Sequence, residues 1–161
     1  MKRQNVSIRL NLKDIDIDIV VGRKQEGNTQ DHSLYTRKSN SWIKTNIYKH
    51  ISFVKKANCR LEILALKIWR KLNSLDFPSF YLEMSVIEAL KNCKTFKLSS
   101  NLLIIFRYLS NNFKDARIID PANSNNIISD ELNKIEKKAI KDLAYSSLSY
   151  LIANSWKDVI W

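Results

Sequence analysis

The sequence has little of what tight turns, disulfide frameworks and metal clusters require. Its 161 residues include only two glycines, two prolines, two cysteines and two histidines. So few glycines and prolines exclude an all-β sandwich or barrel with many tight turns and favour helices. Cys59 and Cys93 have no CxxC partner, which predicts reduced thiols in an intracellular protein. His32 and His50 are too far apart in the sequence to indicate a zinc site.

Long hydrophobic runs are also lacking. The longest aliphatic or aromatic run covers residues 102–106, which is far shorter than the roughly 20 residues of a membrane-spanning helix. The N-terminus has no signal-peptide pattern. A hydrophobic content of 45% nevertheless supports an ordinary folded core. We therefore expect a soluble, cytoplasmic protein that does not associate with membranes.

Acidic residues are scarce relative to basic ones. The net charge is +11, and between Ile19 and Leu72 twelve Lys or Arg residues stand against three acidic residues. Such a local excess attracts the phosphates of nucleotides or of a nucleic-acid backbone. The alternative interpretation is a solvated basic surface that only keeps the protein soluble.

The hydrophobic pattern predicts an α+β, mainly helical fold. Alternation over residues 6–12 and 14–21 predicts a β-hairpin that turns at Lys13 and Asp14. The polar segment 23–48 is predicted to be a long loop. Helical periodicity then predicts a bundle of about four helices, at 58–73, 79–92, 101–113 and 129–156, with a connector at 114–128.

Several residues mark these helices. Leu61, Leu64, Ile68 and Leu72 give the first helix its apolar spacing. Serine side chains are predicted to cap the other three helices. The predicted caps are Ser79, after Pro78, for the second helix, Ser99 or Ser100 for the third, and Ser129 for the last.

The second strand of the hairpin carries three acidic residues in strict alternation with isoleucine. Asp14, Asp16 and Asp18 fall on one face of a strand, with Ile15, Ile17 and Ile19 on the other. Neighbouring carboxylates repel unless cations lie opposite them, and clustered carboxylate oxygens are ligands that magnesium prefers. The alternative is an exposed strand with a solvated acidic face.

Three short motifs follow this strand. They are Leu66-Lys67-Ile-Trp69, Phe77-Pro-Ser79-Phe80-Tyr-Leu-Glu83, and Ile119-Asp120-Pro-Ala-Asn123-Ser-Asn125-Asn126. In this order, from about residue 6 onward, the chain resembles the C-terminal part of a polymerase-β-type nucleotidyltransferase. In particular it resembles the oligoadenylate synthetase and bacterial CD-NTase (cGAS/DncV-like) group. A strand of that group ends in a motif similar to Asp-Leu-Val-Pro, which Asp18-Ile-Val-Val21 matches except at Val21.

The resemblance implies roles for several residues. Asp18 is expected to be the third metal-binding and catalytic aspartate, with Asp16 as its rival, and Mg²⁺ or Mn²⁺ as the cofactor. Lys67 and Ser79 are expected to bind the triphosphate of ATP, GTP or another nucleoside triphosphate. Other matched residues are expected to be architectural: Glu83 in an ion pair, Trp69 and Phe80 in the core, and Asp120 bonded to nearby backbone amides.

The aromatic residues of the predicted loop have two possible roles. Tyr35 and Trp42 either stack on a base beside a phosphate site, or they pin the loop to the core.

The resemblance also shows what the chain lacks. The sequence has no Gly-Ser dipeptide, which the family uses to grip phosphates ahead of a first pair of acids. We therefore expect residues 1–50 to form part of a catalytic palm, with the hairpin as a remnant of its sheet, and residues 51–161 to form the helical C-terminal domain.

The expected function follows from this division. It is that of a fragment or split half of an enzyme making cyclic or linear oligonucleotide messengers in antiphage defence, inactive by itself. Its partner is expected to be a separately encoded N-terminal lobe or a second copy. The alternative is a non-catalytic basic helical module that binds a nucleotide, RNA or a partner protein.

Overall fold

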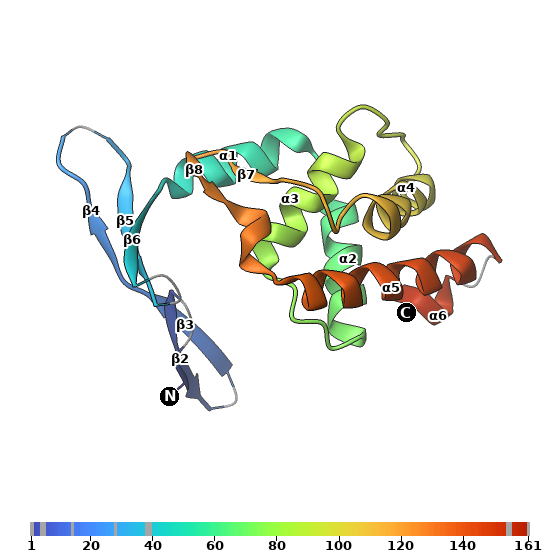
Figure 1. Ribbon diagram of the computed structural model, residues 1–161, viewed down its shortest axis with the longest axis horizontal. Coiled ribbons are helices and arrows are strands. Elements are labelled where there is room, and N and C mark those ends of the chain that lie inside the picture. The colour runs from blue at the N-terminus through green and yellow to red at the C-terminus, as the bar shows by residue number, and fades with distance from the viewer. Residues whose placement is uncertain are drawn as a thin grey trace. The chain divides into compact units, whose positions relative to one another are not determined.

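The computed structural model describes residues 2–3, 6–13, 15–27, 29–37, 40–153 and 156–160. It has an α+β fold in which two small antiparallel sheets precede a set of helices and a two-stranded sheet lies between two of the helices in the chain, so the predicted fold class is confirmed (Figure 1). The chain divides into two compact units. The first unit comprises residues 1–52 and 120–126, and the second comprises 53–119 and 127–161.

The predicted N-terminal hairpin is confirmed. Strands β2 (Ser7–Leu12) and β3 (Ile15–Val20) pair antiparallel, with Ser7 opposite Val20 and Leu12 opposite Ile15. The short strand β1 (Lys2–Arg3) adds to the other edge of β2. Lys13 adopts a left-handed conformation with φ of 49° at the turn, whereas Asp14 lies outside the described residues.

The prediction of an irregular loop over residues 23–48 is wrong. This segment forms a second antiparallel sheet from β4 (Gly22–Lys24), β5 (His32–Thr36) and β6 (Ser41–Thr45). It then enters helix α1 (Ile47–Ala57). The strands are only three to five residues long and rich in polar residues, so the segment has no clear apolar alternation.

The connector predicted at 114–128 contains a small hairpin of β7 (Ile119–Asp120) and β8 (Asn123–Ile127). A short 3₁₀ helix, η1 (Ile128–Glu131), follows it.

The second unit contains the hydrophobic core. Its helices are α2 (Arg60–Leu72), α3 (Ser79–Leu90), α4 (Leu98–Asn111), α5 (Lys134–Ile152) and α6 (Lys157–Ile160). Trp69 and Phe106 are fully buried with their rings edge to face, 5.2 Å between centroids, and the Trp69 indole donates to Ser147 Oγ at 2.9 Å. Phe80 packs partly buried against this core. Among the helices of the described ranges, none is both long and apolar enough to cross a membrane.

The helix starts follow the sequence only in part. Helix α3 begins at Ser79 as predicted, but the predicted serine cap is wrong, because Pro78 occupies the N-cap position and no side chain caps the helix. Helix α4 begins at Leu98, ahead of both serines assigned as its cap. The cap predicted for the last helix is also wrong, because Ser129 lies in η1 and its hydroxyl accepts from the Ile118 amide at 3.3 Å. Asn133 caps α5 instead, in a capping box with Glu136.

Helix α2 is apolar on more than one face. Its buried side chains include Ile63, Leu66 and Trp69. Leu61, Leu64 and Leu72, which give the helix its sequence periodicity, are exposed. The period therefore identifies the helix but not the face that packs against the core.

Candidate functional site

The acidic face of β3 lies against polar side chains of β2. Arg9 is opposite Asp18 in the strand register, and Asn11 is opposite Asp16. Arg9 binds Asp18 in a bidentate pair, with Nε 2.8 Å from Oδ1 and Nη2 2.9 Å from Oδ2. Asn11 Nδ2 donates to Asp16 Oδ1 at 3.0 Å. A cation therefore lies opposite the carboxylates, as their mutual repulsion requires.

The ion pair also shifts the pKa of both partners. Hydrogen bonding from Arg9 holds the pKa of Asp18 below its usual value, and the same contact raises the pKa of the Arg9 guanidinium. The Asp18 carboxylate is thus kept in the charged form that a metal ion would bind.

The described residues do not complete a magnesium site by themselves. Asp16 and Asp18 offer carboxylate oxygens of the right kind, on side chains that are 56% and 40% exposed. Both oxygens of Asp18 are already bonded to Arg9. Across the described ranges, His, Cys, Asp and Glu side chains form no group of three or more that could hold a metal ion. Further carboxylates would have to come from elsewhere.

The opposite face of β3 is apolar and exposed. The exposed fractions are 65% for Ile15, 40% for Ile17 and 45% for Ile19. In its sheet β3 is an edge strand, since the order is β1-β2-β3. The isoleucine side chains of β3 are therefore accessible beside the edge of the sheet.

Helices α2 and α3 bring two cations against the start of α3. Lys67 Nζ lies 2.5 Å from Glu83 Oε1, which confirms the expected ion pair of Glu83. Arg70 Nη1 donates to Ser79 Oγ at 3.0 Å and to the Phe77 carbonyl at 2.6 Å. Sequence reasoning missed Arg70, although it lies one helical turn from Lys67 and therefore on the same side of α2.

The start of α3 has the features of an anion site. Pro78 occupies the N-cap position and makes no side-chain capping bond to the first amides of the helix. Free amides and the helix dipole at such an end favour a negative charge. Arg70 contacts Ser79 at this helix start, and Lys67 contacts Glu83 one turn further along α3. Asp16 and Asp18 belong to the first unit, whereas these residues belong to the second.

Two hollows in the second unit lie away from these residues. One, of about 570 Å³, is lined by Lys114, Asp130, Asn133 and Lys137 with three neighbours. The other, of about 440 Å³, is lined by Asn58, Glu62, Lys94 and Phe96 with three neighbours. Neither lining contains a residue that the sequence assigns to a site.

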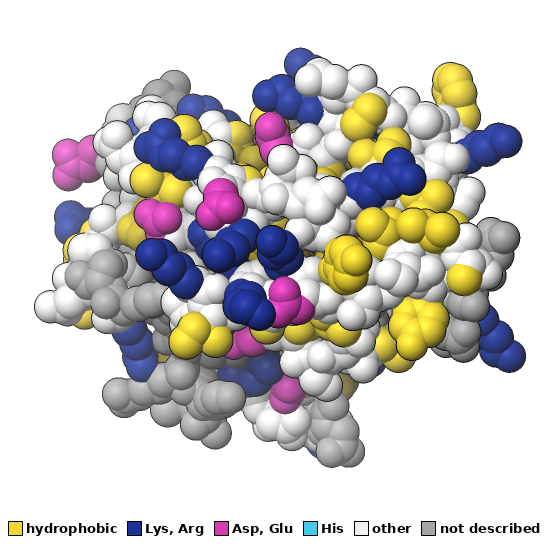
Figure 2. All heavy atoms as spheres, turned by 45° about the vertical axis from the view of Figure 1, so that its right-hand side comes forward, with side chains coloured by type: hydrophobic (Ala, Val, Ile, Leu, Met, Phe, Trp, Pro, Cys, Tyr) yellow, Lys and Arg dark blue, Asp and Glu magenta, His cyan; other side chains and the backbone are white. Residues whose placement is uncertain are grey.

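Several Lys and Arg side chains gather left of the centre on the face seen in Figure 2, with Asp and Glu side chains beside them, and other basic side chains are scattered over the rest. Because acidic side chains lie among the gathered basic ones, charge alone does not mark a site on this face.

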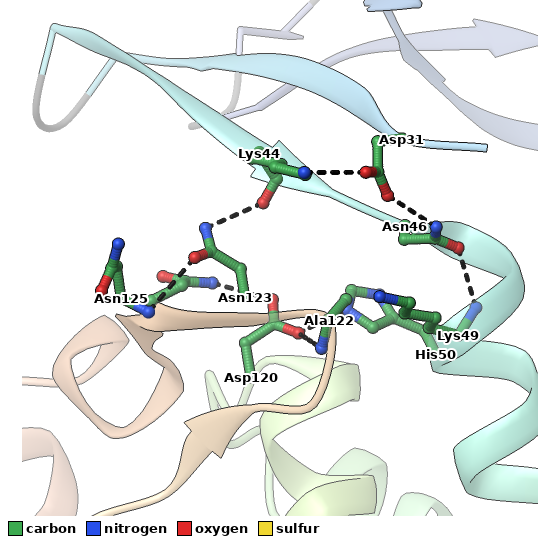
Figure 3. A network of polar contacts seen from close by, with 10 residues as sticks. Asp31, Lys44, Asn46, Lys49, His50, Asp120, Ala122, Asn123 and Asn125 are labelled. Carbon is green, nitrogen blue, oxygen red and sulfur yellow. Dashed lines mark hydrogen bonds and ion pairs between the residues drawn. The ribbon is translucent and has the colours of Figure 1, made fainter. Parts of the chain in front are cut away.

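Asp120 organises a buried polar network in the first unit (Figure 3). Its Oδ1 accepts from the Ala122 amide at 2.7 Å and lies 2.6 Å from His50 Nε2, while its Oδ2 accepts from Asn126 Nδ2 at 3.0 Å. Burial acts to raise the pKa of Asp120, but these hydrogen bonds outweigh it, so the pKa is lowered. The expected bond from Asp120 to a nearby backbone amide is confirmed, whereas its contact with His50 was not foreseen.

No protein-family model matches the chain, and no curated protein matches it significantly. Its fold is similar to that of CdnC from E. coli MS115-1. The structure of CdnC with ATP matches with a TM-score of 0.78 and 21% identity, over 95% of this chain and 59% of that one. The structure of a complex of CdnC with HORMA-deltaN gives a TM-score of 0.77 at 21% identity, over 96% and 58%. The chain thus has a CD-NTase-like nucleotidyltransferase fold and spans less than two thirds of the length of CdnC.

Proposed function

We propose that this chain contributes to a nucleotidyltransferase that makes cyclic or linear oligonucleotide second messengers from ATP or GTP, in antiphage defence. The observation that carries the proposal is the likeness to CdnC over 95% of the chain. CdnC has been solved with ATP, and the motifs that resemble this family run through the same residues.

Asp18 is proposed to supply one carboxylate of the metal site, with Asp16 as the alternative. When bound, a pair of divalent ions would stabilise the charge on the attacking and leaving oxygens. Arg9 keeps the Asp18 carboxylate charged and would have to release it. Asp18 could then also accept the proton of the attacking hydroxyl.

Lys67, Arg70 and Ser79 are proposed to bind the triphosphate. An ammonium and a guanidinium beside a helix N-terminus offset the charge of the β- and γ-phosphates. Glu83 pairs with Lys67, so a triphosphate would compete with this carboxylate.

The exposed isoleucine face of β3 is proposed to be covered by another chain. The likeness covers 59% of CdnC, and across the described ranges Asp16 and Asp18 belong to no group of three or more side chains that could hold a metal ion. A separately encoded lobe or a second copy would cover the isoleucine face and supply further carboxylates. CdnC has also been solved with HORMA-deltaN, so we include a protein of that kind among the proposed partners.

The second candidate function is a non-catalytic module that binds a nucleotide, RNA or a partner protein. The observation that favours it is the state of the predicted site residues. The charge of Asp18 is paired with Arg9, and the charge of Lys67 is paired with Glu83, within the chain itself. Such a module would keep the fold and the basic charge without turnover.

ATP binding tests the triphosphate site. We expect weak, salt-sensitive binding of a fluorescent ATP analogue, because screening weakens contacts between charges. Lys67→Ala should lower the affinity about tenfold, the scale of one hydrogen bond to a charged group. Glu83→Gln should raise the affinity, because it frees Lys67 from its counter-charge.

The matched control is Lys157→Ala, which removes an exposed lysine of α6 and should leave the affinity unchanged. Equal losses for Lys67→Ala and Lys157→Ala, or no effect of Glu83→Gln, would remove the case for a specific phosphate site.

A further inference from the structure

We propose that one face of the β4–β6 sheet binds single-stranded nucleic acid, with Trp42 and Tyr35 stacking on bases and Arg23 contacting the backbone phosphates. This proposal does not depend on nucleotidyl transfer, because it uses none of the residues assigned to that reaction. It rests on the register of the sheet, the exposure of two aromatic rings, and the charge beside them.

The strand register places these side chains on one face. Directly opposed residues of antiparallel strands point to the same side of a sheet, as do residues two apart in one strand. Tyr35 is opposite Trp42, Ser33 is opposite Lys44, and Arg23 is opposite Ser33. Since Ser33 and Tyr35 are two residues apart on β5, all five side chains share a face. The strands lie side by side in Figure 1.

The two aromatic rings form an ordered, exposed pair. Their centroids are 5.6 Å apart with an interplanar angle of 64°, and the exposed fractions are 60% for Trp42 and 38% for Tyr35. The Tyr35 hydroxyl donates to Asn40 Oδ1, and Asn40 adopts a left-handed conformation at the turn between the strands. This contact fixes the tyrosine before any ligand arrives. An exposed ring that is already held in place loses little freedom when a base stacks on it.

Positive charge lies diagonally beside the aromatic pair. Arg23 and Lys44 share their face and are both exposed. Lys44 forms an ion pair with Asp31, whose Oδ2 lies 2.7 Å from Lys44 Nζ. We therefore assign the phosphate contact to Arg23. Its partner on β5 is Ser33, which lies two residues, or about 7 Å, along that strand from Tyr35.

This combination of features fits single strands rather than duplexes. Bases in a single strand expose their faces and stack on aromatic side chains, whereas bases in a duplex are already stacked on each other. Trp, Tyr and Arg also dominate binding sites for proteins. The excess of basic residues in the chain, with a net charge of +11, favours a polyanion as the ligand.

The test is a binding titration with the whole chain. The probes are labelled oligouridylate and oligodeoxythymidylate of about ten nucleotides, a duplex of the same length, and ATP. The variants are Trp42→Ala, Trp42→Phe and Arg23→Ala. Tyr145→Ala serves as the matched control, because Tyr145 is 65% exposed on α5. Tryptophan emission is recorded in the same titration, and comparing RNA with DNA shows whether the 2′-hydroxyl matters.

We expect single strands to bind with strong salt dependence. Trp42→Ala should weaken that binding about tenfold or more, the scale of one lost stacking contact. Trp42→Phe should keep most of the affinity but lose the quenching of tryptophan emission, which separates stacking from a folding defect. Arg23→Ala should weaken binding and flatten its salt dependence, and Tyr145→Ala should change neither.

Three results would overturn the proposal. The first is that no single strand binds, as expected if the face serves a partner protein. The second is that Trp42→Phe keeps the full quenching. The third is that Trp42→Ala weakens duplex or ATP binding as much as it weakens single-strand binding. A failure of the Lys67 site, by contrast, would appear as a loss of ATP binding and would leave single-strand binding and its quenching unchanged.

Discussion

Asp120 shows how far a single residue can be understood from its neighbours in sequence. The Asp-Pro turn predicts a carboxylate bonded to nearby amides, and the bond to Ala122 agrees with that. The contact with His50 joins residues 70 positions apart. No local pattern predicts such a contact, because it depends on how residues 47–52 of α1 and residues 120–126 pack within the first unit.

The Asp120 network predicts a pH-dependent stability. A carboxylate whose folded pKa is lowered contributes stability above its unfolded pKa, about 3.9, and that contribution is lost as the pH falls through the folded value. Asp120→Asn should therefore destabilise the protein by about 1–3 kcal/mol near neutral pH, the scale of a lost buried hydrogen-bond partner. The difference from wild type should shrink below about pH 4. Urea unfolding across this pH range measures both effects.

The control for this prediction is Asp142→Asn. Asp142 is an exposed partner of Lys138 on α5, and such surface pairs contribute little to stability. Similar losses for Asp120→Asn and Asp142→Asn would show that the buried network has no special weight.

At the scale of elements, strong periodicity predicts the structure and weak periodicity does not. The hairpin alternates strictly, and it forms where the pattern predicts it. The second sheet was missed because its strands are short, and Thr36 and Thr45 put polar side chains at buried positions. The start of α5 differs from the prediction because the reciprocal Asn133–Glu136 capping box, itself a sequence signature, sets it rather than Ser129.

Strand β3 predicts self-association through its isoleucine face. An exposed edge and a contiguous apolar patch favour pairing with another chain. Light scattering at increasing concentration should show dimers or larger species. Ile17→Lys should shift them toward monomers, whereas Ile135→Lys, at an 81% exposed position on α5, should not.

Hydrogen exchange gives an independent check of the hairpin. A monomer at all concentrations, with strongly protected amides throughout residues 6–21, would show that the hairpin is satisfied within the chain. The case for a covering partner would then fail.

At the scale of the whole molecule, the sequence motifs led to the CD-NTase-like fold, and the likeness to CdnC supports the same conclusion. Motif order along the chain carries this information, since each helix that bears a motif is recognisable by itself. The pairing of the predicted site residues did not follow from the motifs. The bonds from Arg9 to Asp18 and from Arg70 to Ser79 depend on strand register and helix packing, which local patterns do not specify.

The most direct test of the account is turnover by the 161 residues alone. Purified chain is incubated with labelled ATP and GTP in Mg²⁺ or Mn²⁺, and ATP binding is measured on the same preparation so that misfolding is not mistaken for inactivity. We predict ATP binding without any cyclic or linear product, because Asp16 and Asp18 on one strand face cannot position two metal ions. Robust product that disappears in Asp18→Ala would contradict the account, since the chain would then contain a complete catalytic site.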